Sequence, residues 1–258
     1  MIAALAVAAI ALSAVMALAW LAQRRTGNSG WIDAIWSFGV GGATVLTLAL
    51  LPANGSRRVL LGALVAIWSA RLGSHILSRT RRTPDDPRYA KLMKEWGAAA
   101  PLRLFLFLQL QAVAGLVLVG AAVLAASGPA AVLTPATLLF ATLAIATVVG
   151  EAVADAQLAA CKRDGPENAV CDRGLWACSR HPNYFFEWLF WLSISALALT
   201  PPTQAHAALA LAAPAMMYVL LRYGSGVPHL EAHMRRTRPE AFAAYASRVP
   251  VFFPRIQF

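Results

Sequence analysis

The sequence predicts an all-α integral membrane protein, and three observations lead to this fold class. Of its 258 residues, 59% are hydrophobic and only 13% are charged, with a mean hydropathy of +0.60. Soluble proteins carry about 25% charged residues. The apolar residues gather in stretches of about 20, the length that crosses a bilayer as a helix. No room is left for a separate soluble domain, so we expect one membrane domain, residues 1–258.

Seven apolar stretches follow one another along the chain, and each predicts a transmembrane helix. The first precedes the basic pair Arg24 and Arg25, the wrong charge order for a cleaved signal peptide, so we expect it to remain as a helix. The glycines of residues 39–42 lie in the second stretch and indicate a helix-packing face rather than a phosphate loop. The sixth and seventh stretches are short and could tilt or form a shallow hairpin. The expected spans are residues 1–22, 31–51, 59–77, 104–126, 130–160, 184–200 and 205–223.

Basic residues fall almost entirely on one side of this seven-helix arrangement. It receives 19 of the 22 Lys and Arg residues, while Arg57 and Arg58 lie opposite and Arg71 lies inside the third span. Because Lys and Arg accumulate in cytoplasmic loops, we expect the N-terminus outside and the C-terminus in the cytoplasm, in a bacterial inner membrane or an equivalent one. The net charge of +10 then faces membrane lipid, and we expect no nucleic acid partner.

Three cysteines, Cys161, Cys171 and Cys178, lie within 18 positions of one another. They form no Cys-x-x-Cys pair and are too few for a disulfide framework. We therefore expect them to be reduced and structural, and we expect no metal site.

Four ionisable side chains stand out inside the predicted spans, where the cost of a charge makes each a candidate functional residue. They are Asp33 in the second span, Arg71 and His75 in the third, and Glu187 in the sixth. Arg71, His75 and Arg79 follow at intervals of four and share one helix face. The structural alternatives are a salt bridge from Arg71 to Asp33 or Glu187, and a helix–helix hydrogen bond for His75.

The loop of residues 79–101 mixes arginines with acidic and aromatic residues. A loop that only sets topology needs positive charge, but it has no need of the sequence DDPRY (residues 85–89). Arginine clusters beside an aromatic ring suit a nucleotide, whose phosphates accept charge-assisted forks and whose base stacks. The arginines that we assign to this role are Arg79, Arg82 and Arg88.

The strongest local motif is GLWACSRHPNYFFEW, residues 174–188. Pro182 suits the first turn of a helix, and a basic pair ahead of a helix N-terminus forms an anion site. Asn183 and Glu187 are four residues apart and face the same side, just inside the membrane. The motif therefore predicts a binding site at the cytoplasmic mouth of the sixth span, formed by Arg180, His181, Asn183, Tyr184 and Glu187.

The sequence resembles the steroid 5α-reductase family and its bacterial relatives in this motif. The resemblance extends to ADAQ (residues 154–157), the region of residues 71–89, SGVPHLE (residues 225–231), Tyr245 and FFP (residues 252–254). It implies a multi-spanning reductase that uses NADPH to reduce a carbon–carbon double bond conjugated to a ketone, as in 4-en-3-one steroids. Two departures stand out, because Phe186 occupies a position that is usually Gly, and Ala177–Cys178 replaces a larger pair.

The resemblance also assigns roles residue by residue. It implies that Asp155, Arg180, Asn183 and Glu187 hold the cofactor, and that Lys162 and Arg173 lie near its phosphates. A hydrophobic enone is expected to enter from the bilayer, and its carbonyl needs a donor placed in advance. We assign this role to Asp33 in its protonated form, with His75 as the alternative. The expected NADPH-binding residues are Arg79, Arg82, Arg88, Asp155, Lys162, Arg173, Arg180, His181, Asn183, Tyr184 and Glu187.

Two other functions remain open at this point. The isoprenylcysteine carboxyl methyltransferases, which bind S-adenosylmethionine, share an Arg-His-Pro-x-Tyr element and a Glu before a Tyr-rich tail. Glu187 and the single Glu231 favour the reductase over such a methyltransferase. A transporter would explain Asp33 and Arg71, but it gives no reason for the arginine-rich loop, and the sequence lacks evident inverted repeats.

Overall fold

The computed structural model of the chain describes residues 1–51, 55–127, 134–166, 169–199 and 207–255. In these ranges all regular elements are helices, which confirms the all-α fold class. Six helical segments are long and apolar enough to cross a membrane, so the chain has the fold of an integral membrane helical bundle. They are Ile2–Thr26, Gly30–Leu50, Gly55–Thr80, Pro87–Ala126, Pro135–Asp164 and Ala208–Thr237.

Each of the seven predicted spans coincides with a helix. The sixth, α8, has 17 residues and is too short to count among those six segments. Residues 130–133, 200, 205 and 206 of the predicted spans lie outside the described residues. The seven helices are α1 (Ile2–Thr26), α2 (Gly30–Leu50), α3 (Gly55–Thr80), α5 (Ala100–Ala126), α6 (Pro135–Asp164), α8 (Pro182–Ala198) and α9 (Ala212–Tyr223).

Six shorter helices are also found within the described residues; η2 lies inside the seventh predicted span, and the other five lie in segments where the sequence predicts no transmembrane helix. The longest three begin with a proline in their first turn, where the missing N–H is not needed. These shorter elements are α4 (Pro87–Trp96), η1 (Gly97–Ala99), α7 (Leu175–Cys178), η2 (Ala207–Leu211), α10 (Val227–Thr237) and α11 (Pro239–Arg248).

The chain divides into two compact units. Unit 1 comprises Met1–Leu138 and Ile194–Ala213, and unit 2 comprises Leu139–Ser193 and Pro214–Phe258. Unit 1 therefore holds α1 to α5 with η2, and unit 2 holds most of α6, α8 and α9 together with α7, α10 and α11. The single domain expected from the sequence stays a prediction.

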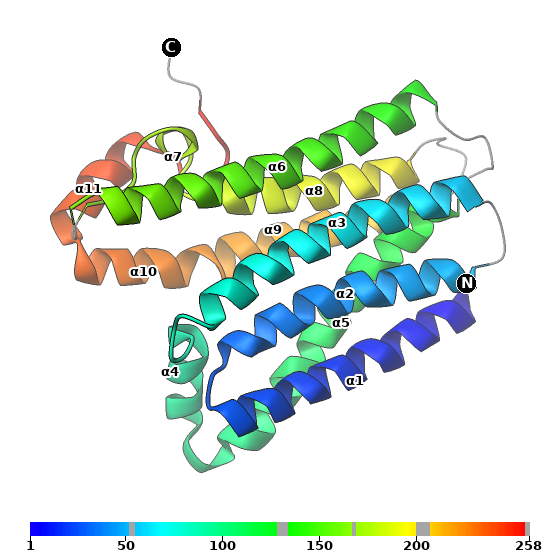
Figure 1. Ribbon diagram of the computed structural model, residues 1–258, viewed down its shortest axis with the longest axis horizontal. Coiled ribbons are helices and arrows are strands. Elements are labelled where there is room, and N and C mark those ends of the chain that lie inside the picture. Colours follow the sequence, from blue (N-terminus) through cyan, green and yellow to red (C-terminus); the bar gives the residue numbers. More distant parts are fainter. Residues whose placement is uncertain (52–54, 128–133, 167–168, 200–206, 256–258) are drawn as a thin grey trace. The chain divides into compact units, whose positions relative to one another are not determined.

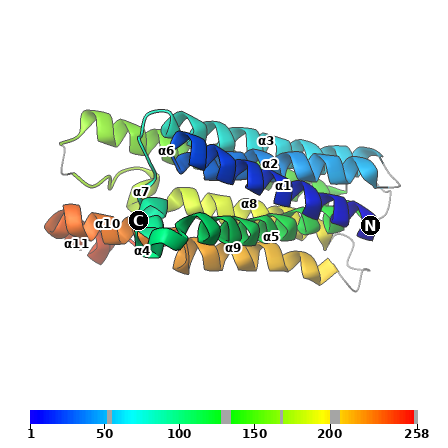
Figure 2. The ribbon, with the colours of Figure 1, turned by 90° about the horizontal axis from the view of Figure 1, so that it is seen from below.

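In unit 1, α2 packs between α1 and α3, and α5 packs against α1 and α2 (Figures 1 and 2). Glycines permit this close approach. A Cβ on Gly39 would lie 2.6 Å from Val15 Cγ1 of α1, and a Cβ on Gly41 would lie 2.2 Å from Ser69 Oγ of α3. The helix-packing face predicted for residues 39–42 is thus confirmed, because small residues let helix backbones approach one another in a membrane.

Two arginines at the start of α3 hold the C-terminal ends of three other helices in unit 1. Arg57 is buried; its Nε donates to the carbonyl of Ala125 in α5 at 2.6 Å, and its Nη2 donates to that of Leu197 in the last turn of α8. Arg58 donates to the carbonyl of Leu51, at the end of α2. The last carbonyls of a helix lack intrahelical donors and carry partial negative charge. These two basic residues, opposite the side that holds most of the charge, therefore act as helix caps.

In unit 2, α8 lies beside α6 and joins α9 through aromatic contacts with the C-terminal tail (Figure 1). The Tyr218 ring of α9 lies 5.2 Å from that of Phe252, and the Trp188 ring of α8 lies 6.2 Å from it. The Trp188 indole also donates to the carbonyl of Pro214 at 3.1 Å. These contacts place the tail against the helix that begins at the motif RHPNY.

Candidate functional site

Unit 1 contains a polar cluster whose members come from α2, α4 and α5. Asp86 caps α4 by accepting a hydrogen bond from the backbone N–H of Arg88 at 3.0 Å, and Pro87 follows in the first turn. This cap fixes the start of the helix and so places Arg88 and Tyr89 in its first turn. The arginine-rich stretch therefore ends in a helix.

Tyr89, which is 4% exposed, lies at the centre of this cluster. Its hydroxyl donates to Asp33 Oδ1 at 2.8 Å and accepts from Gln111 Nε2 at 2.8 Å. Arg88 Nη2 pairs with the other carboxylate oxygen of Asp33. The carboxylate predicted to act as a neutral donor is thus held in an ion pair, and it accepts hydrogen bonds from the Tyr89 hydroxyl and from Arg88.

Arg88 is shared between two carboxylates. Besides Asp33, it binds Asp86 through Nε at 3.0 Å and through Nη2 at 2.8 Å. Burial alone would raise the pKa of Asp86, but the hydrogen bonds and charge of Arg88, with the charge of Arg79, hold that pKa below its ordinary value. Of the arginines assigned to phosphate, Arg79 is half exposed and lies 3.6 Å from Asp86, and Arg82 is exposed.

The arginine-rich loop is anchored on the turn between α1 and α2. Asn28 Nδ2 donates to the carbonyls of Thr80 and Thr83 at 3.1 and 2.9 Å, and the Ser29 N–H donates to Asp85 Oδ1 at 2.7 Å. The loop is therefore a fixed part of unit 1. Its exposed guanidinium groups are presented from an ordered backbone.

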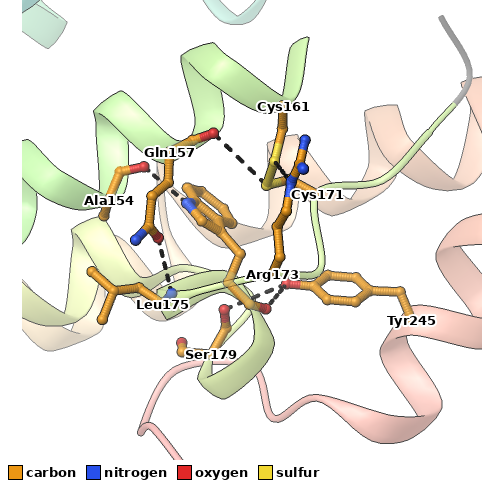
Figure 3. The surroundings of a disulfide bond; sticks show 9 residues. Ala154, Gln157, Cys161, Cys171, Arg173, Leu175, Ser179 and Tyr245 are labelled. Carbon is orange, nitrogen blue, oxygen red and sulfur yellow. Dashed lines mark hydrogen bonds between the residues drawn. A yellow bond between two sulfur atoms is a disulfide. The ribbon is translucent and has the colours of Figure 1, made fainter. Parts of the chain in front are cut away.

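In unit 2, the segment before α8 is docked on α6 (Figure 3). Gln157 Oε1 accepts from the backbone N–H of Leu175 at 2.9 Å, and Trp176 Nε1 donates to the carbonyl of Ala154 at 2.9 Å. Gly174 precedes this segment with φ +60, a backbone conformation that glycine adopts without strain. Helix α8 begins at Pro182, as the sequence predicts.

Arg180 is tied to the C-terminal helices of unit 2. Its Nη1 donates to the carbonyls of Ala246 and Val249, at the end of α11, at 2.9 and 3.3 Å. Its Nε lies 2.9 Å from Glu231 Oε1 of α10. Two of its three nitrogens thus contact protein atoms, and its contact with a cofactor stays a prediction.

His181 and Tyr184 form a stacked pair beside the buried carboxylate of Glu231. The two rings lie 5.6 Å apart with an interplanar angle of 11°, and His181 Nε2 lies 3.5 Å from Glu231 Oε1. Burial is the largest influence on His181 and lowers its pKa, while Glu231 acts in the opposite direction. The other ring nitrogen, Nδ1, is buried and has no hydrogen-bond partner within the described residues.

The structure joins Asp155 and Asn183, two residues that the resemblance assigns to the cofactor. Asn183 Nδ2 donates to Asp155 Oδ1 at 3.1 Å, which links α8 to α6. One turn further along α8, Glu187 is buried and accepts from Trp191 Nε1 at 3.2 Å. Lys162, at the end of α6, and Arg173, before α7, are both exposed.

Cys161 and Cys171 form a disulfide bond, so the expectation that they are reduced is wrong (Figure 3). The end of α6 and the loop that follows it bring the two Cα atoms to 5.6 Å, within the range of a disulfide. The spacing of ten residues in the sequence does not by itself predict that the two cysteines lie close together. Cys178 is reduced, as expected.

The predicted site residues thus divide between the two units. Unit 1 contains Asp33, Arg79, Arg82 and Arg88, and it also contains His75, which is exposed on α3 and whose alternative role stays a prediction. The others lie in unit 2. Five further residues contact these groups but were not assigned to a site from the sequence. They are Tyr89 and Gln111 in unit 1, and Gln157, Glu231 and Tyr245 in unit 2. For Gln111, a polar amide inside an apolar span was a signal that could have indicated it.

The fold and these buried polar clusters define a helical integral membrane protein with two groups of candidate functional residues. The chain belongs to a family described as "Protein of unknown function (DUF1295)", whose model matches residues 19–249. No match to the chain was found among curated proteins, and none among solved structures.

Proposed function

We propose that this protein is an NADPH-dependent membrane reductase that transfers a hydride to the conjugated C=C bond of a hydrophobic enone, such as a 4-en-3-one steroid. The proposal starts from the resemblance of residues 174–188 to the steroid 5α-reductase family. The observation that carries it is the buried hydroxyl of Tyr89, which lies between the Asp33 carboxylate and the Gln111 amide.

Reduction of an enone requires a donor at the carbonyl oxygen, because negative charge develops there when the β-carbon accepts a hydride. Asp33 is paired with Arg88 and so acts as a hydrogen-bond acceptor. We therefore assign the donor role to Tyr89, in place of a protonated Asp33. Its proton, which the Asp33 carboxylate accepts in this structure, would turn to the substrate oxygen as a hydrogen bond when the enone binds, while Gln111 keeps the hydroxyl in place and the positive charge of Arg88 offsets the negative charge that develops on that oxygen.

The residues of unit 2 fit the cofactor. A nicotinamide carboxamide needs both a donor and an acceptor, which Asn183 and the buried Glu187 provide. The Nδ1 nitrogen of His181 is buried with its hydrogen-bonding capacity left. Lys162 and Arg173 are exposed cations suited to phosphate. NADPH, when bound, supplies the hydride, and these residues bind and orient it.

The donor assignment is tested with the full-length protein in detergent, by following NADPH oxidation and the mass of the product from a 4-en-3-one steroid. Tyr89→Phe removes only the hydroxyl and should lower kcat by about 10²- to 10³-fold, with NADPH affinity unchanged. Tyr223→Phe, at a tyrosine that is 62% exposed, is the matched control and should keep full activity. Full turnover by Tyr89→Phe would refute the donor assignment.

The cofactor assignment is tested by mass spectrometry of the nucleotide released from purified protein and by two substitutions. NADP(H) supports the reductase, whereas S-adenosylmethionine or its homocysteine product would replace it with a methyltransferase. Glu187→Ala should abolish reduction while Glu95→Ala, at an exposed site, should not. Arg82→Ala should raise the KM for NADPH and leave that for NADH nearly unchanged, because only NADPH carries a 2′-phosphate.

A further inference from the structure

The loop between α6 and α7 connects α6 to the C-terminal helices of unit 2. Its Cys171 is bonded to Cys161 in the last turns of α6. The residues on either side of Cys171 both contact α11. Val170 packs against the buried cluster of Phe242, Tyr245 and Val249, and Asp172 pairs with Arg248 at 3.2 Å.

The same helix is held again a few residues further along the chain. The Tyr245 hydroxyl donates to the carbonyl of Trp176 at 2.7 Å, and burial raises the pKa of this tyrosine, which keeps its proton in place. Arg180 binds the last carbonyls of α11. Residues 170–180 therefore lie between α6 and α11, with the disulfide as the covalent end of that connection.

The disulfide is accessible to a reductant and lies beside a cation. Both cysteines are only partly buried, so a small reductant can reach them. Arg173 Nε donates to Cys161 Sγ at 3.3 Å (Figure 3). A cation beside a sulfur stabilises its thiolate form, which is the better leaving group in thiol–disulfide exchange.

The side of the membrane on which this loop is expected to lie indicates what the disulfide does. The loop carries Lys162, Arg163 and Arg173, and the charge distribution of the whole chain predicts that it lies in the cytoplasm. Disulfides in the cytoplasm of most organisms are transient and serve catalysis or redox sensing. A permanent structural disulfide would be out of place on this side of the membrane.

We propose that Cys161 and Cys171 are a thiol–disulfide exchange site that takes a dithiol reductant and controls how firmly α11 is held to α6. A thiolate of the reductant attacks Cys171 Sγ, the Cys161–Cys171 bond breaks, and Cys161 leaves as a thiolate beside Arg173. The second thiol of the reductant then displaces Cys171 and forms an intramolecular disulfide. Two electrons and two protons pass to the protein, and the reverse reaction with a disulfide oxidant closes the bond again.

The exchange is measured on the full-length protein in detergent. Thiols are blocked with N-ethylmaleimide, with and without dithiothreitol, and counted by mass. Cys178 is the internal standard, so one blocked thiol is expected in the oxidised protein and three in the reduced one. Oxidised dithiothreitol should restore the count of one. Three thiols under every condition, or one thiol that dithiothreitol does not change, would overturn the proposal.

The role of Arg173 is tested by the rate of reduction. Arg173→Gln should slow reduction by dithiothreitol by about threefold for each unit by which the pKa of the Cys161 thiol rises. Arg163→Gln is the matched control, since Arg163 is an exposed arginine of the same region that pairs with Asp164. Equal rates in the wild type and Arg173→Gln would remove Arg173 from the proposal.

The effect on α11 is measured by amide hydrogen exchange in the two redox states. Reduction should raise exchange in Pro239–Arg248 by about tenfold or more, because a covalent link across the loop no longer limits its opening. Helix α1 in unit 1 should not change. The double variant Cys161→Ser, Cys171→Ser should match the reduced state with or without dithiothreitol, whereas Cys178→Ser should respond as the wild type does. Unchanged exchange in α11 on reduction would overturn the control of α11.

Discussion

Replacement of Gly150 by alanine is expected to destabilise unit 2, although alanine is the better helix former. A Cβ on Gly150 of α6 would lie 2.7 Å from Cε1 and Cζ of Phe186 in α8, well inside van der Waals contact. Alanine in place of glycine in a helix interior favours the helix by about 0.5–1 kcal/mol. Overpacking of a tight contact costs about 1–3 kcal/mol. The steric cost should therefore exceed the gain in helix propensity, and Gly150→Ala should lower the free energy of unfolding by about 1 kcal/mol.

Removal of the ring should reverse the sign of the effect. In a Phe186→Ala background nothing opposes the new methyl group, so Gly150→Ala should raise stability by about 0.5–1 kcal/mol. The coupling between the two positions then amounts to about 1–3 kcal/mol. The assay is the apparent thermal midpoint of the four proteins in one detergent, where 1 kcal/mol corresponds to roughly 2–4 °C for a chain of this length.

A second glycine separates the intrinsic gain from the steric cost. Gly120 lies inside α5, and a Cβ there would meet nothing within 4 Å, so Gly120→Ala should be stabilising in any background. If Gly150→Ala shifts the midpoint by the same amount and in the same direction with and without the Phe186 ring, the two residues do not touch as described and the reasoning fails.

Three further outcomes follow from the fold. Arg57→Met should lower the thermal midpoint by an amount equivalent to about 2–4 kcal/mol, because two helix-end carbonyls lose a charged donor; Arg57→Lys, which keeps the charge, should lose less. Gly41→Ala should destabilise unit 1 through its contact with Ser69, whereas Gly42→Ala, with nothing within 4 Å, should not, as thermal midpoints will show. Burial holds the pKa of His181 below its ordinary value of about 6.5, so the folded protein binds this proton less tightly than the unfolded chain; the midpoint should fall as the pH drops below about 6.5, and less steeply in His181→Gln.

The positions of the helices follow from local properties of the sequence. An apolar stretch of about 20 residues marks a membrane helix wherever it stands, and Pro182 marks the start of α8 because its missing N–H is not needed there. Helix α4 was missed although Asp86 and Pro87 form a cap and a first turn. The arginines around this cap suit phosphate binding as well as a helix, so charge composition alone does not indicate the helix start.

The contacts among functional residues depend on which helix faces meet, and local patterns do not specify this. Asp33 and Arg88 are 55 residues apart, and Arg180 meets a carbonyl 66 residues away. All three residues were identified from the sequence, but the predicted partners differ from those in the structure: Arg71 for Asp33, and the cofactor for Arg88 and Arg180. It also noted Phe186 as a departure from the motif, and the structure explains this departure because the large ring lies where Gly150 leaves room on α6.

The capping of helix ends by Arg57 has a consequence for how the chain is made. Its two partner carbonyls belong to residues 68 and 140 positions later in the sequence, so neither has been synthesised when α3 leaves the ribosome. A buried guanidinium is costly until it has hydrogen-bond acceptors, because burial removes its hydration. The buried contacts of Arg57 can therefore form only after α5 and then α8 have been synthesised. Chains that terminate before Leu197 are expected to keep this guanidinium at the membrane surface and to be degraded.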